Sequence, residues 1–174
     1  MTLAQAKDMP ASTGLCVYAG SFDPPTNGHA WMIHEGAALF ERLVVAVGIN
    51  PDKRPAYSLD QRLAWLAAIA KPYSNVQVAH FGKSYLADYA TSLGARFMLR
   101  GIRNSQDFAY EQTMRHINAD LRPAITTVFL MPPREHAEVS SSPVRGLIGP
   151  EGWRDIVRRY VPPVVFEHLA TSHA

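Results

Sequence analysis

Apolar residues along the chain fall into two alternating kinds of segment. Short and nearly continuous apolar runs, bounded by glycine, proline or polar residues, are typical of buried strands. These runs occupy residues 15–19, 43–49, 76–81, 96–99 and 125–131. Segments with a helical pattern lie between them, at residues 28–40, 59–70, 85–93 and 105–121. The alternation predicts an α/β fold with a mostly parallel five-stranded sheet and helices on both faces.

Residues at the ends of these segments indicate where helices begin and end. Ser58, with Gln61 three residues later, is typical of a capping box, and Ser105 is a candidate cap for the long helical segment. After Ser140 the chain turns helical again, with interruptions at prolines, which predicts a helical C-terminal appendage packed on the sheet. Residues 1–14 lack periodicity and are expected to be a flexible tail, which leaves 15–174 as one domain.

Composition excludes several classes of protein. The chain has 174 residues, and its 17 Lys and Arg residues nearly balance its 15 Asp and Glu residues. A net charge of +2 gives no sign of a nucleic-acid partner. Cys16 is the single cysteine, so an internal disulfide is excluded, and its place in a strand pattern predicts a core residue. No stretch is typical of a membrane span or a signal peptide, so we expect a cytoplasmic protein without a membrane partner.

The turn after the first apolar run holds the densest group of chemically useful residues. It reads G-S-F-D-P-P-T-N-G-H over residues 20–29. Ligands of α/β sheets bind outside the carboxyl ends of the strands, and the N–H groups of a helix start favour an anion there. At such a helix start, the His29 imidazole is a candidate donor to an α-phosphate oxygen. Asn27 is a candidate helix cap, and Ser21 either contacts a phosphate or bonds its own backbone.

Two other segments place phosphate-binding residue types beyond the predicted strands. Lys53 lies in the N-P-D-K-R-P loop at 50–55, where an ammonium group could clamp a phosphate or could simply be solvated. Serines at 140–142 begin a helix, where hydroxyl and backbone donors either hold an anion or only cap the helix. Position alone does not decide between these alternatives.

A pair of arginines follows the fourth apolar run. Arg100 and Arg103 flank Gly101, which allows close approach of the backbone to a ligand. Guanidinium groups in this arrangement suit bidentate phosphate recognition. The alternative pairs them with Asp107 and Glu111 as structural ion pairs, which are common, and the residues alone leave both possibilities open.

These motifs together resemble those of the nucleotidylyltransferase superfamily. T-x-G-H after F-D-P is most similar to the form found in the bacterial phosphopantetheine adenylyltransferase family. The resemblance covers about residues 15–148 and has four parts: T-N-G-H at 26–29, N-P-D-K-R-P at 50–55, R-G-I-R with D-F-A-Y-E at 100–111, and S-S-S-P-V-R at 140–145. Ala19, Ser21 and Trp31 depart from the usual family residues, and Ser21 retains the hydroxyl of the usual threonine.

The resemblance implies a single-domain Rossmann-like fold and a set of site residues. The residues implied in catalysis are His29, Lys53 and Arg103. Those implied in ATP binding are Ser21, Phe22, His29, Gly101, Ile102, Arg103, Glu111, His136, Ala137, Glu138, Val139, Ser140, Ser141 and Ser142. Those implied in acceptor binding are Ser21, Lys53, Leu86 and Arg100. Phe108 and Tyr110 are interpreted as packing residues instead of ligand contacts.

The activity that the resemblance implies is transfer of AMP from ATP to 4′-phosphopantetheine, which gives dephospho-coenzyme A and pyrophosphate. The residues offer phosphate binders and no obvious general base, which suits an acceptor phosphate that is already ionised. Mg²⁺ is expected to arrive with ATP, with no metal site made by the protein. The family's habit implies a homo-oligomer, a hexamer, and coenzyme A is a possible feedback ligand. The alternatives are a sister transferase acting on another phosphorylated acceptor such as nicotinate mononucleotide, or a non-catalytic nucleotide-binding module.

Overall fold

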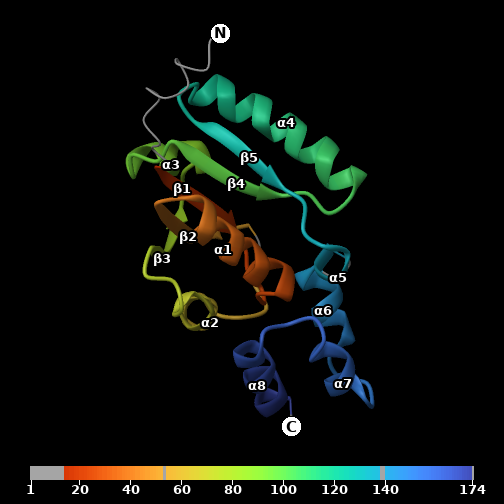
Figure 1. Ribbon diagram of the computed structural model, residues 1–174. Coiled ribbons are helices and arrows are strands. Elements are labelled where there is room, and N and C mark those ends of the chain that lie inside the picture. The colour runs from red at the N-terminus through yellow and green to blue at the C-terminus, as the bar shows by residue number, and fades with distance from the viewer. Residues whose placement is uncertain (1–13, 53, 138–139, 174) are drawn as a thin grey trace.

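In the computed structural model, which describes residues 14–52, 54–137 and 140–173, five strands form one parallel sheet in the order β3-β2-β1-β4-β5 (Figure 1). The strands are β1 (Leu15–Gly20), β2 (Arg42–Ile49), β3 (Val76–Gly82), β4 (Phe97–Gly101) and β5 (Thr126–Leu130). Each pairs with its neighbour in parallel, so the five predicted strands are confirmed and the sheet is wholly parallel.

The order of the strands reverses at the centre of the sheet. The chain moves outward from β1 to β2 and β3, and then β4 returns to the other side of β1. Gly20 at the end of β1 lies opposite Val47, and Tyr18 lies opposite Leu99 of β4. In open α/β sheets ligands bind at such a reversal, outside the carboxyl ends of the strands. The turn after β1 and the segment after β4 therefore meet where a site is expected.

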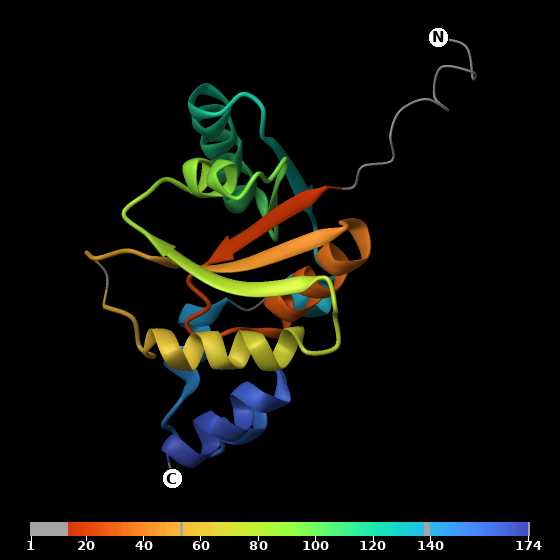
Figure 2. The same ribbon diagram turned by 90° about the vertical axis from the view of Figure 1, so that its left-hand side faces the viewer.

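Helices cover both faces of the sheet, as predicted. They are α1 (Asn27–Leu39), α2 (Leu59–Ala70), α3 (Leu86–Ser92) and α4 (Ser105–Leu121). Side chains of β1 alternate between two cores, because successive strand residues point to opposite faces. Cys16 and Tyr18 pack in the core that contains residues of α1 and α2, whereas Val17 and Ala19 pack in the core that contains residues of α3. Figure 2 shows α3 and α4 on one side of the sheet and α1 and α2 on the other.

The helix caps confirm one prediction and correct another. Ser58 caps α2, and it exchanges hydrogen bonds with Gln61 in the predicted capping box. The cap of α4 is Asn104, and the prediction of Ser105 was wrong. Asn104 has an extended backbone and its side chain accepts a 2.9 Å hydrogen bond from the N–H of Asp107, whereas Ser105 is already the first helical residue.

Four more helices follow β5 in the described part of the chain, and the three that begin after Ser140 form the predicted C-terminal appendage. The four are α5 (Arg134–Ala137), α6 (Ser141–Leu147), α7 (Trp153–Val157) and α8 (Pro163–Ser172), and Figure 1 shows α7 and α8 below α2. The apolar cluster of α6, α7 and α8 is built around Trp65 of α2, with Val144, Val157 and Leu169 fully buried. The appendage thus packs on α2, and the expectation that it packs directly on the sheet was wrong.

Two further points concern the N-terminal tail and membrane-spanning helices. The tail expected at residues 1–14 lies outside the described residues except for Gly14. Within the described residues, every helix is too short or too polar to cross a membrane.

Candidate active site

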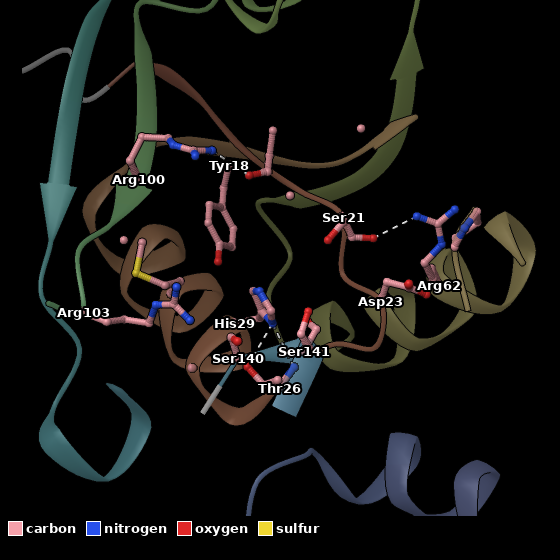
Figure 3. Close-up of a pocket in the computed structure, with 18 of the residues that line it drawn as sticks. Tyr18, Ser21, Asp23, Thr26, His29, Arg62, Arg100, Arg103, Ser140 and Ser141 are labelled. Carbon is pink, nitrogen blue, oxygen red and sulfur yellow. Dashed lines mark hydrogen bonds between the residues drawn. The ribbon is translucent and has the colours of Figure 1, made fainter. Parts of the chain in front are cut away.

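A cavity of about 670 Å³ opens where the ends of β1, β2 and β4 meet the starts of α1 and α6 (Figure 3). Its volume is typical of a small-molecule site. The sequence-predicted residues that line it are Ser21, His29, Arg100, Gly101, Arg103, Glu111, His136, Ser140, Ser141 and Ser142. The structure therefore brings predicted residues from three distant segments of the sequence, 21–29, 100–111 and 136–142, into one cavity.

Other predicted residues do not line this cavity. Phe22 is fully buried, with a backbone φ of 48°, and its ring packs edge-on against the His29 ring at 5.1 Å between centroids. Ile102 is buried, and Leu86 packs at the edge of the core on the α3 side of the sheet. Ala137 is part of α5 and is also absent from the lining. Three more predicted residues lie outside the described part of the chain: Lys53, Glu138 and Val139.

His29 is held in one orientation by the residue that caps its helix. Thr26 is the N-cap of α1, and its backbone N–H donates a 2.9 Å hydrogen bond to Nδ1 of His29. The Thr26 hydroxyl lies 3.0 Å from the same nitrogen. Because Nδ1 accepts a hydrogen bond from the backbone, the neutral imidazole must carry its proton on Nε2. The site thus contains an imidazole N–H donor whose tautomer is set by the fold.

The electrostatic surroundings keep this imidazole neutral. Burial lowers the pKa of His29 to about 4, and the positive charge of Arg103 contributes to the lowering. Burial acts in this direction because it disfavours the charged form of the ring. At neutral pH, His29 is therefore an uncharged hydrogen-bond donor beside a guanidinium group.

Asn27 does not cap α1, and the prediction that it could is wrong. The residue with the extended, capping backbone is Thr26, and Asn27 is already helical. Asn27 instead binds the appendage. Its backbone N–H donates to the carbonyl of Tyr160 at 2.8 Å, and its side-chain amide donates to the carbonyl of Arg159 at 3.0 Å. The start of the His29 helix is thus bonded to the connection between α7 and α8.

Both arginines of the R-G-I-R segment make the ion pairs that the sequence offered as an alternative. Nε of Arg100 lies 2.9 Å from each carboxylate oxygen of Glu111, which is 7% exposed. Nε of Arg103 lies 2.7 Å from Asp107, and these hydrogen bonds lower the pKa of Asp107. Both arginines still line the cavity. Ion pairing and contact with a ligand are therefore compatible here.

The three serines stand at the start of α6, and two of them are linked to the β1–α1 turn. The hydroxyl of Ser141 donates to the carbonyl of Pro24 at 2.8 Å. Arg145 donates to the carbonyl of Asp23 and, at 2.9 Å, to the hydroxyl of Ser142. Ser140 is the N-cap of α6 by its backbone, but its side chain makes no capping hydrogen bond in this part of the structure. Its hydroxyl therefore faces the cavity without serving the helix.

Comparison with known proteins shows the family of the chain that carries this site. A model of the cytidylyltransferase-like family matches residues 17–147. A protein of Chromobacterium violaceum is 52% identical over 158 residues, which cover 91% of this chain and 96% of that protein. One of Neisseria meningitidis serogroup C is 52% identical over 165 residues, with 95% and 97% covered. Both are named phosphopantetheine adenylyltransferase. This chain belongs to their family.

A solved structure shares the fold at much lower sequence identity. The nicotinic acid mononucleotide adenylyltransferase of Plasmodium falciparum, in complex with NaAD, superposes with a TM-score of 0.66 over 91% of this chain and 95% of that one. The two sequences are 13% identical, so the likeness extends to the fold alone. It confirms a Rossmann-like α/β architecture of the kind found in nucleotidyltransferases.

Several residues that line the cavity were missed from the sequence. Tyr18 lies on β1, and burial raises the pKa of its phenol, so the hydroxyl stays protonated. Arg62 of α2 is 4% exposed. A sequence signal for Arg62 existed, because it lies three and four residues before the buried Trp65 and Leu66, on the apolar face of the helix. A charged residue at such a position indicates a specific buried role.

Carboxylates around the cavity are already engaged. Asp23 accepts backbone hydrogen bonds, and Asp107 and Glu111 pair with arginines. Within the described residues, no group of three or more His, Cys, Asp or Glu side chains has the arrangement of a metal site.

Proposed function

We propose that this chain transfers AMP from ATP to the phosphate of 4′-phosphopantetheine, giving dephospho-coenzyme A and pyrophosphate. The observation that carries the proposal is the fixed Nε2–H donor of His29 in a cavity lined by arginines and serines. The name of the relatives that are 52% identical supports phosphopantetheine as the acceptor. No covalent enzyme intermediate is part of the proposal.

His29 acts on the α-phosphate of ATP in this mechanism. The acceptor phosphate, already ionised near neutral pH, attacks the α-phosphorus in line. A new P–O bond forms as the bond between the α-phosphorus and the bridging oxygen breaks, and pyrophosphate leaves with the electron pair. Negative charge develops on the α-phosphate oxygens, and the Nε2–H group of His29 donates to one of them. Arg103, whose charge already influences the pKa of His29, stabilises the same charge.

The cavity has two sides in this proposal. ATP occupies the side formed by Gly101, Arg103, His136 and the serines 140–142. The acceptor phosphate lies between Ser21, Arg100 and the loop at 50–55, whose Lys53 is proposed to clamp it. The support for this division is that Ser21 and the loop follow β1 and β2, whereas the serines stand at the N-terminus of α6. Leu86 and the start of α3 would flank the pantetheine arm.

Mg²⁺ is proposed to enter with ATP. When bound, it would neutralise charge on the phosphate oxygens of ATP. The cavity suits this arrangement, because its carboxylates are engaged and its free donors are cationic or hydroxyl groups.

A pyrophosphate-release assay against a panel of acceptors tests the function. With ATP and Mg²⁺, 4′-phosphopantetheine should support turnover, whereas nicotinate mononucleotide, FMN and glycerol 3-phosphate should not. If one of those three supports turnover and phosphopantetheine does not, the proposed acceptor is wrong. The proposed transfer of AMP would still stand. ATP binding without pyrophosphate release from any acceptor would indicate a non-catalytic nucleotide-binding module.

Lys53 provides a sharper test of the acceptor side. Lys53→Ala should raise the KM for phosphopantetheine or lower turnover, while the Kd for ATP measured by calorimetry stays the same. Lys71→Ala, which removes an exposed lysine after α2, is the matched control. Weaker ATP binding in Lys53→Ala alone would move Lys53 to the nucleotide side.

We further propose that the enzyme is a cytoplasmic homo-oligomer, a hexamer, that binds coenzyme A as a feedback ligand. The support for association is a set of exposed apolar side chains on α4 and directly after β5. Phe108 and Tyr110, interpreted as packing residues, are 52% and 61% exposed, and Ile117 and Met131 are 43% and 72% exposed. Light scattering of the purified protein measures its mass directly, and a monomer would refute the proposal. Competition of coenzyme A with ATP, followed by calorimetry, tests the feedback ligand.

A further inference from the structure

Two buried charged side chains connect the β1–α1 turn with the segment that leads into α2. Asp23, in the turn, is 7% exposed, and its carboxylate accepts hydrogen bonds from the backbone N–H groups of Ala56 and Tyr57, each at 2.9 Å. Arg62, in α2, donates from Nη1 to the carbonyl of Ser21 at 2.9 Å (Figure 3). In both sets the donors lie in the segment 56–62 and the acceptors lie in the turn, but the charged side chain comes from the turn in one set and from α2 in the other. We call Asp23 and Arg62 the clasp.

Each side chain of the clasp is charged and bonds to backbone groups. Arg62 also donates from Nε to the carbonyl of Ser58 at 3.3 Å, and within the described residues it has no carboxylate partner. Burying a guanidinium or a carboxylate is costly, and an apolar residue would fill the same volume without this cost. Charge-assisted bonds to peptide groups hold the backbone in one position. The clasp therefore has the chemistry of a positioning device.

The segments that the clasp joins form one side of the cavity. Ser21 lines the cavity from the turn, and Asn50, Pro51, Arg54 and Pro55 line it from the loop after β2. Ala56 and Tyr57, which Asp23 holds, follow this loop immediately. The distance between Ser21 and the loop thus depends on the clasp. Asp23 also lies 3.6 Å from Arg145 of α6, but Arg145 keeps a second bond to the Asp23 carbonyl that does not need the carboxylate.

We propose that Asp23 and Arg62 are positioning residues that hold Ser21 and the segment Arg54–Pro55 at the separation the acceptor phosphate requires. This inference rests on the proposed function, which puts the acceptor phosphate on this side. Misplacement of a binding group by about 1 Å can cost on the order of 10²-fold in rate. The clasp therefore governs the KM of the acceptor and the rate of transfer, and it leaves the binding of ATP unchanged.

Four proteins test the proposal: the unaltered chain, Asp23→Asn, Arg62→Lys and the double variant. An asparagine offers one acceptor oxygen for two N–H groups. A lysine carries all its donors on one nitrogen, so it cannot reproduce the separate Nε and Nη1 bonds of Arg62. Each single change should lower kcat/KM for phosphopantetheine by roughly 10- to 100-fold, with the Kd of ATP within about threefold by calorimetry. The double variant should match the more damaged single variant, because both residues serve the same gap. Additive losses, or an equal loss of ATP affinity, would overturn the proposal.

Hydrogen exchange supplies a measurement that does not depend on catalysis. Asp23→Asn should speed exchange of the Ala56 and Tyr57 amides. Arg62→Lys, which does not touch those amides, should speed it as well, because the turn that carries Asp23 is loosened. Unchanged exchange in Arg62→Lys would overturn the clasp. If the unaltered chain fails to adenylylate phosphopantetheine, the proposed function is wrong. Hydrogen exchange of the Ala56 and Tyr57 amides still decides whether Asp23 and Arg62 act together.

Matched controls distinguish the effect of losing the clasp from the effect of losing any charge and from unfolding. Asp60→Asn removes an exposed carboxylate at the start of α2, and Arg115→Lys makes the conservative change at an exposed position of α4. Both should retain acceptor KM, kcat and exchange. Thermal melting of every variant identifies any that does not fold. If Asp23→Asn unfolds, the milder Arg62→Lys carries both readouts.

Discussion

Two walls of the cavity, the β1–α1 turn and helix α4, differ in how much of the remaining chain is bonded to them. The turn accepts hydrogen bonds from Ser141 of α6 and Arg62 of α2, and Asn27 bonds it to the appendage. Helix α4 has 17 residues, yet within the described structure Glu111 is its single buried residue. Several of its apolar side chains are exposed instead.

The difference indicates a division of roles. In the proposed mechanism His29 stabilises the transition state. Such a group must be in place before the reaction, and the densely bonded turn would provide this. Helix α4 contributes Glu111 and Asp107, which hold the two arginines. We therefore expect substitutions in the turn to change chemistry, and substitutions in α4 to change stability and association.

The largest effect on turnover is expected when the imidazole donor of His29 is removed. His29→Ala should lower kcat by ~10²- to 10³-fold, the usual result of removing one preorganised hydrogen-bond donor. The Kd of ATP should change far less, because the donor acts mainly as charge develops. His34→Ala, an exposed histidine five residues later on the same helix, is the control and should retain kcat. An equal loss of ATP affinity with kcat unchanged would show that His29 only binds nucleotide.

The two ion pairs of α4 should respond unequally. Glu111 is 7% exposed, and Glu111→Gln removes its charge. Arg100 then has no counter-ion in this pair. Breaking such a pair should lower the free energy of unfolding by roughly 2 kcal/mol or more. Asp107→Asn breaks the Arg103 pair, where the arginine side chain is 35% exposed, and should cost less than about 1 kcal/mol. Denaturant titrations measure both, and equal losses would contradict the assignment of a buried and an exposed pair.

The pH dependence of turnover should reflect the lowered pKa of His29. In the folded protein the imidazole takes up a proton only near pH 4, whereas a histidine in the unfolded chain does so near its ordinary value of 6.5. The neutral donor is therefore present throughout pH 5 to 8, and its contribution to kcat should disappear only as pH falls through about 4. Stability from the neutral imidazole is complete above pH 6.5 and declines between 6.5 and 4.

Nuclear magnetic resonance checks this directly. The ¹⁵N signals of His29 should show the proton on Nε2 and a titration midpoint near 4. His34, exposed on the same helix, provides a reference signal in the same sample. A midpoint near 6.5 for His29 would mean that the imidazole is a cation during part of the physiological range, which contradicts the neutral-donor mechanism.

The elements were predictable from the sequence where local pattern decides them. Helices 59–70 and 105–121 have the predicted bounds, and the five strands follow the five apolar runs. The cap of α4 was not predictable, because asparagine and serine are both good caps. In the structure the backbone is extended at Asn104, and Ser105 is already helical. Pairing of Arg100 with Glu111, and burial of Arg62 against Ser21, depend on how distant segments approach each other. The turn, the arginines and the serines of the site were found from motifs, whereas the residues that position them were found from the fold.

The smallest effect is expected from the bond between the turn and the appendage. Asn27→Ala removes the hydrogen bond to the Arg159 carbonyl, while the backbone bond to Tyr160 remains. One exposed hydrogen bond contributes about 1 kcal/mol, so the melting temperature should fall slightly. Because Ser141, Arg145 and Arg62 still hold the turn, kcat should stay within about twofold. Asn118→Ala on α4 is the matched control. A tenfold loss of kcat in Asn27→Ala alone would show that the turn depends on the appendage, and that its many bonds do not substitute for one another.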